Sequence, residues 1–135
     1  MNLQAKMNQN IRVALSVGEI FDKITILEIK NKKITDKEKL VNIEKELLEL
    51  NNIAKKNIDT DIIEEEIKEL KIVNMELWKI EDDIRDKELL KEFDDHFIKL
   101  ARSVYMVNDK RAKIKKIINI KTNSHLVEEK SYKEY

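Results

Sequence analysis

The 135-residue chain contains no cysteine, no proline and only one glycine. Without cysteine it can form neither a disulfide framework nor a thiolate metal site. No stretch approaches the ~18 uncharged apolar residues that a membrane-spanning helix needs, and the first 30 residues lack the apolar block of a secretory signal. We therefore expect one cytoplasmic domain over residues 1–135 that has no membrane partner.

Charge is abundant but balanced, since 27 basic side chains match 27 acidic ones. Its distribution along the chain is uneven: residues 1–34 carry a net charge of +3, residues 35–95 of −9 and residues 96–135 of +6. Most of these charges are expected on solvated faces. The acidic middle and the basic end can nevertheless complement each other, either within one bundle or between subunits.

Apolar residues recur at intervals of three and four, which predicts an all-α helical bundle. A serine, threonine or aspartate followed three residues later by glutamate predicts a helix start, and such capping boxes occur at Ser16, Thr35 and Asp61. Polar breaks near Asp86 and at Asp94 or Asp95 separate the last two helices. The predicted helices cover residues 16–33, 35–56, 61–85 and 95–121.

The second and third predicted helices are expected to form a long antiparallel hairpin beside a central C-terminal helix. Residues 1–15 form an N-terminal arm that ends in a short extended segment, because Ile11, Val13 and Leu15 alternate with other residues. Residues 123–135 form an aperiodic charged tail, for which disorder is the ordinary expectation. If this tail packs on the bundle, Tyr132 is its expected anchor.

The chain has few of the residues that common active sites use. Two histidines and no cysteine argue against a zinc site, and neither a glycine-rich phosphate loop nor a serine elbow occurs. Acidic pairs such as Glu19 with Asp22, or Asp82 and Asp83 near Glu81, could in principle hold magnesium. About five such pairs are expected from composition alone, so we predict no metal site and no cofactor.

The fourth predicted helix is rich in basic residues. Lys110, Arg111, Lys113, Lys115 and Lys116 lie around the helix instead of along one stripe, and no aromatic residues alternate with them. Because nucleic-acid binding favours a basic stripe with stacking aromatics, no nucleic-acid partner is expected.

Polar residues also occupy positions where the helical spacing predicts burial. On the third helix Trp78, Glu81 and Arg85 follow the core spacing, about a quarter turn from the apolar face. On the fourth helix Tyr105 belongs to a second face edged by Arg102 and Asp109, and Arg111 lies in the core seam itself. On the first helix Asp22 lies nearly opposite the main apolar face.

An arginine or aspartate in a packing seam needs a partner, because leaving it unpaired costs several kcal/mol. The chain has 23 lysines and only four arginines, which suggests that each arginine is kept for its planar five-donor fork. We predict that Asp22, Glu81 and Asp109 face Arg85, Arg102 and Arg111 in one network. This network either fixes helix register or, with Trp78 and Tyr105, lines a pocket for an anionic ligand such as a phosphate or carboxylate.

The start of the first helix allows two interpretations. Ser16 and Glu19 are explained by capping, and Gly18 by backbone preference. Free amides beside the single glycine could instead hold an anion.

Four stretches resemble an uncharacterised family of short bacterial and phage proteins known only as a domain of unknown function. They are SVGEIFDKITILEIK at 16–30, LWKIEDDIR at 77–85, FIKLARSVYMVNDKRAKIKKIIN at 97–119 and EEKSY at 128–132. The stretches keep the family's order and cover about forty per cent of the chain. The resemblance implies no activity, cofactor or catalytic residue. Before the last stretch this chain has TNSH, where the resemblance leads us to expect a glycine.

The first and fourth helices have two-sided patterning, which is more than one small bundle needs and which predicts a homodimer. The leading hypothesis is a non-catalytic binding or assembly protein with a polar groove for a possible anionic small molecule. The alternatives are a small magnesium-dependent enzyme acting on a nucleotide or sugar phosphate, and a purely structural helical oligomer.

Overall fold

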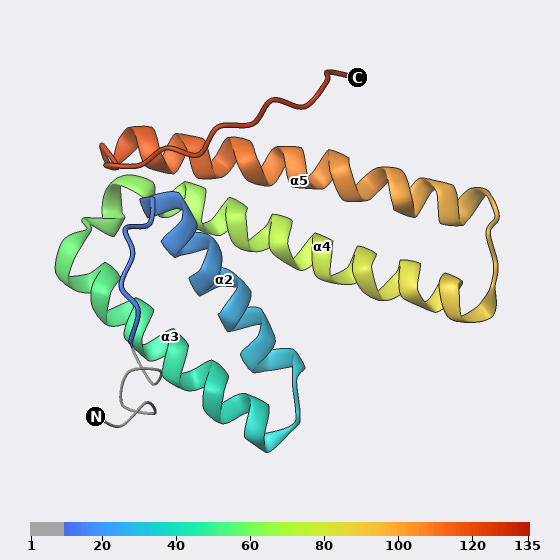
Figure 1. Ribbon diagram of the computed structural model, residues 1–135, viewed down its shortest axis with the longest axis horizontal. Helices are drawn as coiled ribbons and strands as arrows, with labels where there is room; N and C mark the ends of the chain where they lie inside the picture. The colour runs from blue at the N-terminus through green and yellow to red at the C-terminus, as the bar shows by residue number, and fades with distance from the viewer. Residues whose placement is uncertain (1–9) are drawn as a thin grey trace, which may run out of the picture.

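The structure, a computed structural model, describes residues 10–135 and confirms the predicted all-α bundle. Four α-helices and one short 3-10 helix follow each other along these residues, and none of them forms a strand (Figure 1). The elements are α2 (Val17–Lys33), α3 (Lys37–Asn57), η1 (Thr60–Ile63), α4 (Glu64–Leu90) and α5 (Asp95–Lys121). The first nine residues of the predicted N-terminal arm lie outside the described part. Residues 10–16 contain no helix, and Ile11 and Val13 are exposed.

Side-chain caps begin most of these helices. Ser16 accepts a hydrogen bond from the Glu19 amide at 3.1 Å, as predicted, and Asp94 accepts one from the Phe97 amide at 2.9 Å. The other two predicted boxes are wrong. The cap of α3 is Asp36 instead of Thr35, and Asp59 caps η1 so that α4 begins only at Glu64. A neighbouring aspartate, one residue after Thr35 and two residues before Asp61, takes the capping role, because its carboxylate accepts hydrogen bonds from helix-start amides as readily as a hydroxyl does.

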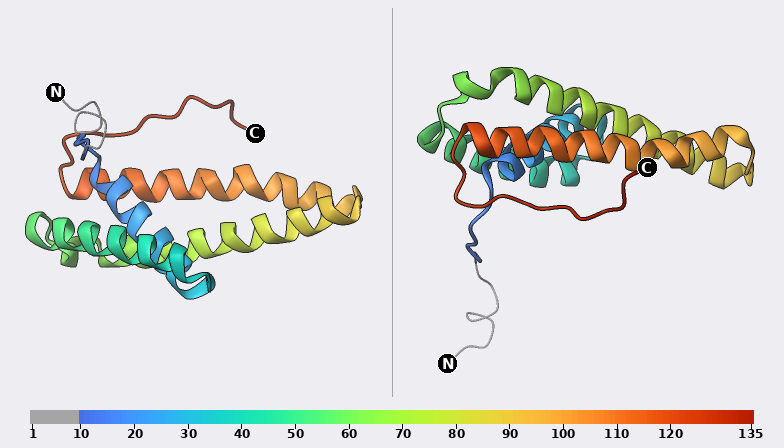
Figure 2. Two further views of the ribbon diagram at one scale, coloured as in Figure 1. Left: turned by 60° about the horizontal axis from the view of Figure 1, so that its bottom comes forward. Right: turned by 90° about the horizontal axis from the view of Figure 1, so that it is seen from above.

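The helices pair differently from the prediction. The long antiparallel hairpin is made by α4 and α5, whereas the expected pairing of the second and third helices is wrong (Figures 1 and 2). The reason is that α2 lies between α3 and α4, the second and third predicted helices, and contacts α3, α4 and α5. Both sides of α2 are buried, and α2 contacts α3 where the prediction placed α4.

The predicted break at Asp86 is also wrong, because α4 continues to Leu90. Lys91 then adopts a left-handed conformation with φ 55°, and its amide donates to the Glu88 carbonyl. Lys87 pairs with Glu92 and with Asp94, each at 2.9 Å, and so holds the turn into α5.

The apolar core lies at one end of the long hairpin. It is formed by Phe21, Ile24, Ala54, Ile63, Leu70, Val73, Val107, Ile114 and Ile118. Beyond this core the hairpin extends past α2 and α3, and no residue of α4 after Asn74 is buried (Figure 1). We call residues 75–106 the distal hairpin. Among residues 10–135 no helix is both long and apolar enough to cross a membrane.

Gly18 allows α2 to approach α5 closely. A Cβ at this position would lie 2.5 Å from the Lys115 carbonyl oxygen and 3.0 Å from Asn119 Oδ1. Both neighbours are held, since the first is helix backbone and the second accepts a hydrogen bond from the Gly18 amide at 2.7 Å. The glycine is therefore required by the helix crossing, and a general backbone preference does not explain it.

The Gly18→Ala variant should be less stable than the wild type by about 1–3 kcal/mol, because α2 must move away from α5. An ordinary helical glycine behaves oppositely, since alanine stabilises such a position by about 0.5–1 kcal/mol. Urea denaturation measures the change, with the exposed Asn51→Ala on α3 as the control for helix propensity. A more stable Gly18→Ala chain would contradict the close approach.

Candidate functional site

The central polar contact of the molecule is an ion pair between Asp22 of α2 and Arg111 of α5. The Asp22 side chain is 1% exposed, and both of its oxygens accept hydrogen bonds from the guanidinium, one of them from Nε at 2.8 Å. Asn74 Nδ2 of α4 donates to Asp22 Oδ1 at 3.0 Å and to Thr25 Oγ1 at 2.9 Å. Because a bidentate pair fixes orientation as well as distance, this contact sets how α2, α4 and α5 meet.

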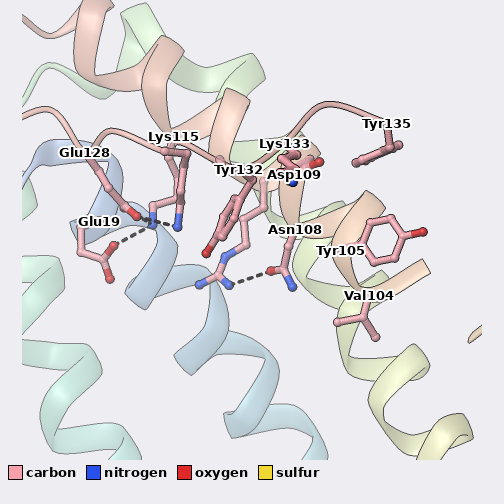
Figure 3. A pocket seen from close by; sticks show the side chains of 13 residues that line it. Glu19, Val104, Tyr105, Asn108, Asp109, Lys115, Glu128, Tyr132, Lys133 and Tyr135 are labelled. Carbon is pink, nitrogen blue, oxygen red and sulfur yellow. Dashed lines mark hydrogen bonds and ion pairs between the residues drawn. The ribbon is translucent and has the colours of Figure 1, made fainter. Parts of the chain in front are cut away.

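A second ionic contact lies one turn further along α5. Lys115 Nζ donates to Glu19 Oε2 of α2 at 2.7 Å and to Glu128 Oε2 of the C-terminal tail at 3.2 Å (Figure 3). The same nitrogen is 3.9 Å from Asp22, and Lys130 pairs with Glu128 at 2.8 Å. Positive and negative groups therefore alternate from the buried Asp22 outwards to the tail.

The tail runs back along α5 in the opposite direction (Figures 1 and 2). It turns at Asn123, which adopts a positive φ of 52° in the region where a glycine was expected. Asparagine is the residue that best tolerates this conformation after glycine. Further along, Glu129 pairs with Lys116 at 3.2 Å, and the Tyr135 ring meets the Tyr105 ring edge-on at 5.1 Å.

Tyr132 is not the anchor of this tail, because its side chain remains 76% exposed. Glu128 and Glu129 hold the tail instead, and the similarly exposed Tyr135 adds only its edge-on contact with Tyr105. Charged groups on α5 were available to bind the tail, so its docking does not require burial of an aromatic ring.

The tail and α5 enclose a groove of about 710 Å³ (Figure 3). Three tyrosines and both signs of charge line it: Tyr105, Tyr132, Tyr135, Arg111, Lys115, Lys130, Lys133, Glu19, Asp109 and Glu128. A second groove of about 600 Å³ lies beside it and shares the tail residues. The tail is therefore a common wall of two open grooves on α5.

Neighbouring charges shift several pKa values here. Lys130 and Lys115 lower the pKa of the Glu128 carboxyl below its usual 4.5, and Asp22 raises the pKa of the Arg111 guanidinium. The Asp109 carboxylate raises the pKa of the Tyr135 hydroxyl above its usual 10.0. At neutral pH Glu128 and Arg111 are therefore charged and the Tyr135 hydroxyl keeps its proton.

The structure brings together half of the eight predicted site residues. Tyr105, Asp109 and Arg111 line the groove, and Asp22 lies behind Arg111. The remaining four are elsewhere: Glu81 and Arg85 pair with each other at 3.1 Å on α4, Arg102 is exposed without an ion pair among residues 10–135, and half-buried Trp78 lies near Lys33. The single network of three carboxylates and three arginines is therefore wrong.

Distance along the helix axis explains the difference. Glu81 comes seven residues after Asn74, and Arg102 nine residues before Arg111, so they lie about 10 and 14 Å from the contact at 1.5 Å per residue. Helical spacing predicts which face a residue lies on, but it does not say how far along that face a crossing helix reaches.

The first turn of α2 leaves no room for an anion. The Val17 amide donates to Ser124 Oγ at 3.0 Å, the Gly18 amide to Asn119 and the Glu19 amide to Ser16. Capping is thus the correct interpretation of this helix start, extended by two side chains from the far end of the chain.

Of the five acidic residues considered for magnesium, four are paired with cations. Asp22 and Glu19 are engaged by Arg111 and Lys115, and Asp83 pairs with Lys79 at 3.1 Å. In the part of the chain that the structure describes, no three histidine, aspartate or glutamate side chains cluster so as to hold a metal ion.

Several residues of the site are absent from the prediction. They are Glu19, Thr25, Asn74, Lys115, Asn119, Glu128 and Lys130. Asn74 was visible as a polar residue in a stripe with core spacing. Lys115 and Glu128 could not be recognised from the sequence, because lysine and glutamate are abundant in this chain and their pairing depends on how the tail folds back.

Replacing Arg111 by methionine should lower the free energy of unfolding by about 3–5 kcal/mol, because it leaves the buried Asp22 charge without its main partner. Adding Asp22→Asn to the same chain should recover most of the loss, since it removes the charge itself. Urea denaturation of the single and double variants measures the coupling. Simply additive losses would show that the two side chains do not depend on each other.

Tail docking should weaken as the pH falls below about 4.5. The lowered pKa of Glu128 means that its ion pairs are present above the unfolded value of 4.5 and are lost as the carboxyl becomes protonated below it. Loss of the contact between Tyr135 and Tyr105 should shift the NMR signals of the Tyr105 ring. Because the ion pairs of Glu128 are exposed to solvent, each contributes at most about 1 kcal/mol. Glu128→Gln should show the undocked signals at neutral pH, whereas Glu134→Gln should not.

Comparison with known proteins finds a matching family model but no activity. A family model described as a family of unknown function (DUF6165) matches residues 11–135. No curated protein and no solved structure matches the chain.

Proposed function

Because the chain belongs to the DUF6165 family, whose function is unknown, we propose a function from the groove itself: the protein is a non-catalytic binding protein for an anionic small molecule. The observation that carries the proposal is the combination of three tyrosines with four basic side chains around about 710 Å³ of open space. This volume lies within the range typical of small-molecule sites.

The charges of the groove support an anionic ligand. Arg111, Lys115, Lys130 and Lys133 outnumber the three lining carboxylates. Within residues 10–135 Lys133 has no ion pair, so its ammonium group can bind a phosphate or carboxylate without breaking an existing contact. Arg111 is already held by Asp22, and its position is therefore fixed before a ligand arrives.

The tyrosines support a ligand that also carries a ring. Tyr105 and Tyr132 are both substantially exposed, at 44% and 76%, and tyrosine offers an apolar ring face together with a hydroxyl. A sugar phosphate or a nucleotide combines such a ring with an anionic group. Holding this ligand requires no change in the bundle, because the groove is already open.

The carboxylates of the groove favour binding over catalysis. Glu19 and Glu128 are both bonded to Lys115, and Asp109 is adjacent to the Tyr135 hydroxyl. A general base needs a carboxylate that is free to accept a proton from substrate. A magnesium-dependent enzyme is the alternative class, and a purely structural role for the ion network is the third.

Thermal shift against inorganic phosphate, sugar phosphates and nucleotides tests the proposal. A true ligand at 100 times its Kd should stabilise the protein by about 2.7 kcal/mol and raise Tm. Lys133→Ala and Tyr132→Ala should remove this shift without changing the Tm of the free protein, because both side chains are outside the core. Lys45→Ala on α3 is the matched control and should behave as the wild type.

The remaining outcomes separate the alternatives. A Tm that responds only when magnesium accompanies the nucleotide, together with turnover, would favour the enzyme. If no compound in the panel raises Tm, the binding proposal is wrong and the ion network has a structural role.

A further inference from the structure

The distal hairpin is the part of the molecule where other elements reach α4 and α5 only at the start: Lys33 at the end of α2 lies near Trp78, and the tail meets Tyr105. Its α4 portion contains no buried residue, and Leu100 is the single buried residue in its α5 portion. Two helices alone bury only one narrow stripe from each, so such a hairpin gains little stability by itself. Something else must cover it, or it remains a weakly packed extension.

The stripe that α2 covers continues along the distal hairpin beyond the end of α2 at Lys33. On α4, Asn74 contacts α2, and Trp78, Arg85 and Leu89 follow it at helical spacing. On α5, Ala101 and Ile98 continue the line of Tyr105 in the same way, farther from the core than the contact between Tyr105 and Tyr135. Leu89 is 80% exposed and Ile98 is 52% exposed.

The charges of the distal hairpin match those of a second copy placed antiparallel to it. Residues 75–95 carry nine acidic and four basic groups, whereas residues 96–106 carry two basic groups and no acidic one. Among residues 10–135 no ion pair involves Glu76, Asp82, Asp86, Lys99 or Arg102. The acidic α4 and the basic α5 of one chain thus leave both signs of charge unused.

We infer that the distal hairpin is an interface with a second copy of this chain, whose own distal hairpin lies antiparallel across the uncovered stripe. A twofold axis then brings the acidic α4 of one copy to the basic α5 of its partner. This gives Arg102, which has no ion pair among residues 10–135, a carboxylate to bind.

The size of the surface sets the expected strength. Sixteen residues of α4 extend about 24 Å, and two packed helices are about 20 Å wide. Two such faces bury on the order of 1,000 Å² in total, the lower end for specific complexes. The dimer should therefore form at micromolar concentration and dissociate on dilution.

Sedimentation of the whole chain over a dilution series tests the inference. The wild type should change from dimer to monomer as it is diluted, and Leu89→Lys and Ile98→Lys should each weaken association at least tenfold. Arg102→Glu should also weaken it, and high salt should reduce the difference between Arg102→Glu and the wild type. Leu48→Lys, a similarly exposed position on α3, is the matched control and should leave the dimer unchanged.

All the substituted side chains are exposed, so each variant should keep the helix content of the wild type. Circular dichroism checks that the variants are folded. A wild type that is monomeric at all micromolar concentrations would overturn the inference and leave a different protein as the occupant. A dimer that Leu48→Lys breaks and Leu89→Lys does not would overturn it as well. Neither result tests the groove, because ligand binding is tested with the Lys133→Ala and Tyr132→Ala variants.

Discussion

The ion pair between Asp22 and Arg111 is the contact on which the arrangement of the helices depends. A carboxylate that is 1% exposed must be fully satisfied, and here the guanidinium and the Asn74 amide do so from two different helices. Among the described residues no buried side-chain nitrogen or oxygen lacks a partner. Any sliding or rotation of α2 would leave this charge unpaired, so the pair selects one register among the many that apolar packing alone would tolerate.

The same crossing point explains features that otherwise look unrelated. Gly18 is needed because the register brings α2 against the backbone of α5, and Asn119 and Ser124 then cap α2 from the opposite end of the chain. Lys115 lies one turn from Arg111 and extends the charge alternation to Glu128. The position of the tail, and with it the groove, is thus a consequence of how the buried pair is satisfied.

The two proposed roles, ligand binding and self-association, use opposite ends of the long hairpin. At the proximal end all four α-helices contribute to one core and the tail adds a groove, while at the distal end α4 and α5 extend beyond the other helices. A binding groove benefits from rigid walls, and the core supplies them. The proposed interface uses exposed apolar positions, which the distal hairpin keeps because α2 ends at Lys33. The proposed ligand binding and the proposed self-association can therefore be tested separately.

Local signals in the sequence determined the helices, since apolar spacing and capping residues act within a few positions of each other. They also determined that Asp22 and Arg111 must find partners, because burial of a charge is costly wherever it occurs. Only the tertiary structure decided which partners: Glu81 and Arg102 have the right face but lie too far along their helices, whereas Lys115 and Glu128 meet because the tail folds back. Periodicity encodes the direction of a side chain, and the crossing of helices from distant parts of the chain decides its distance to every other group.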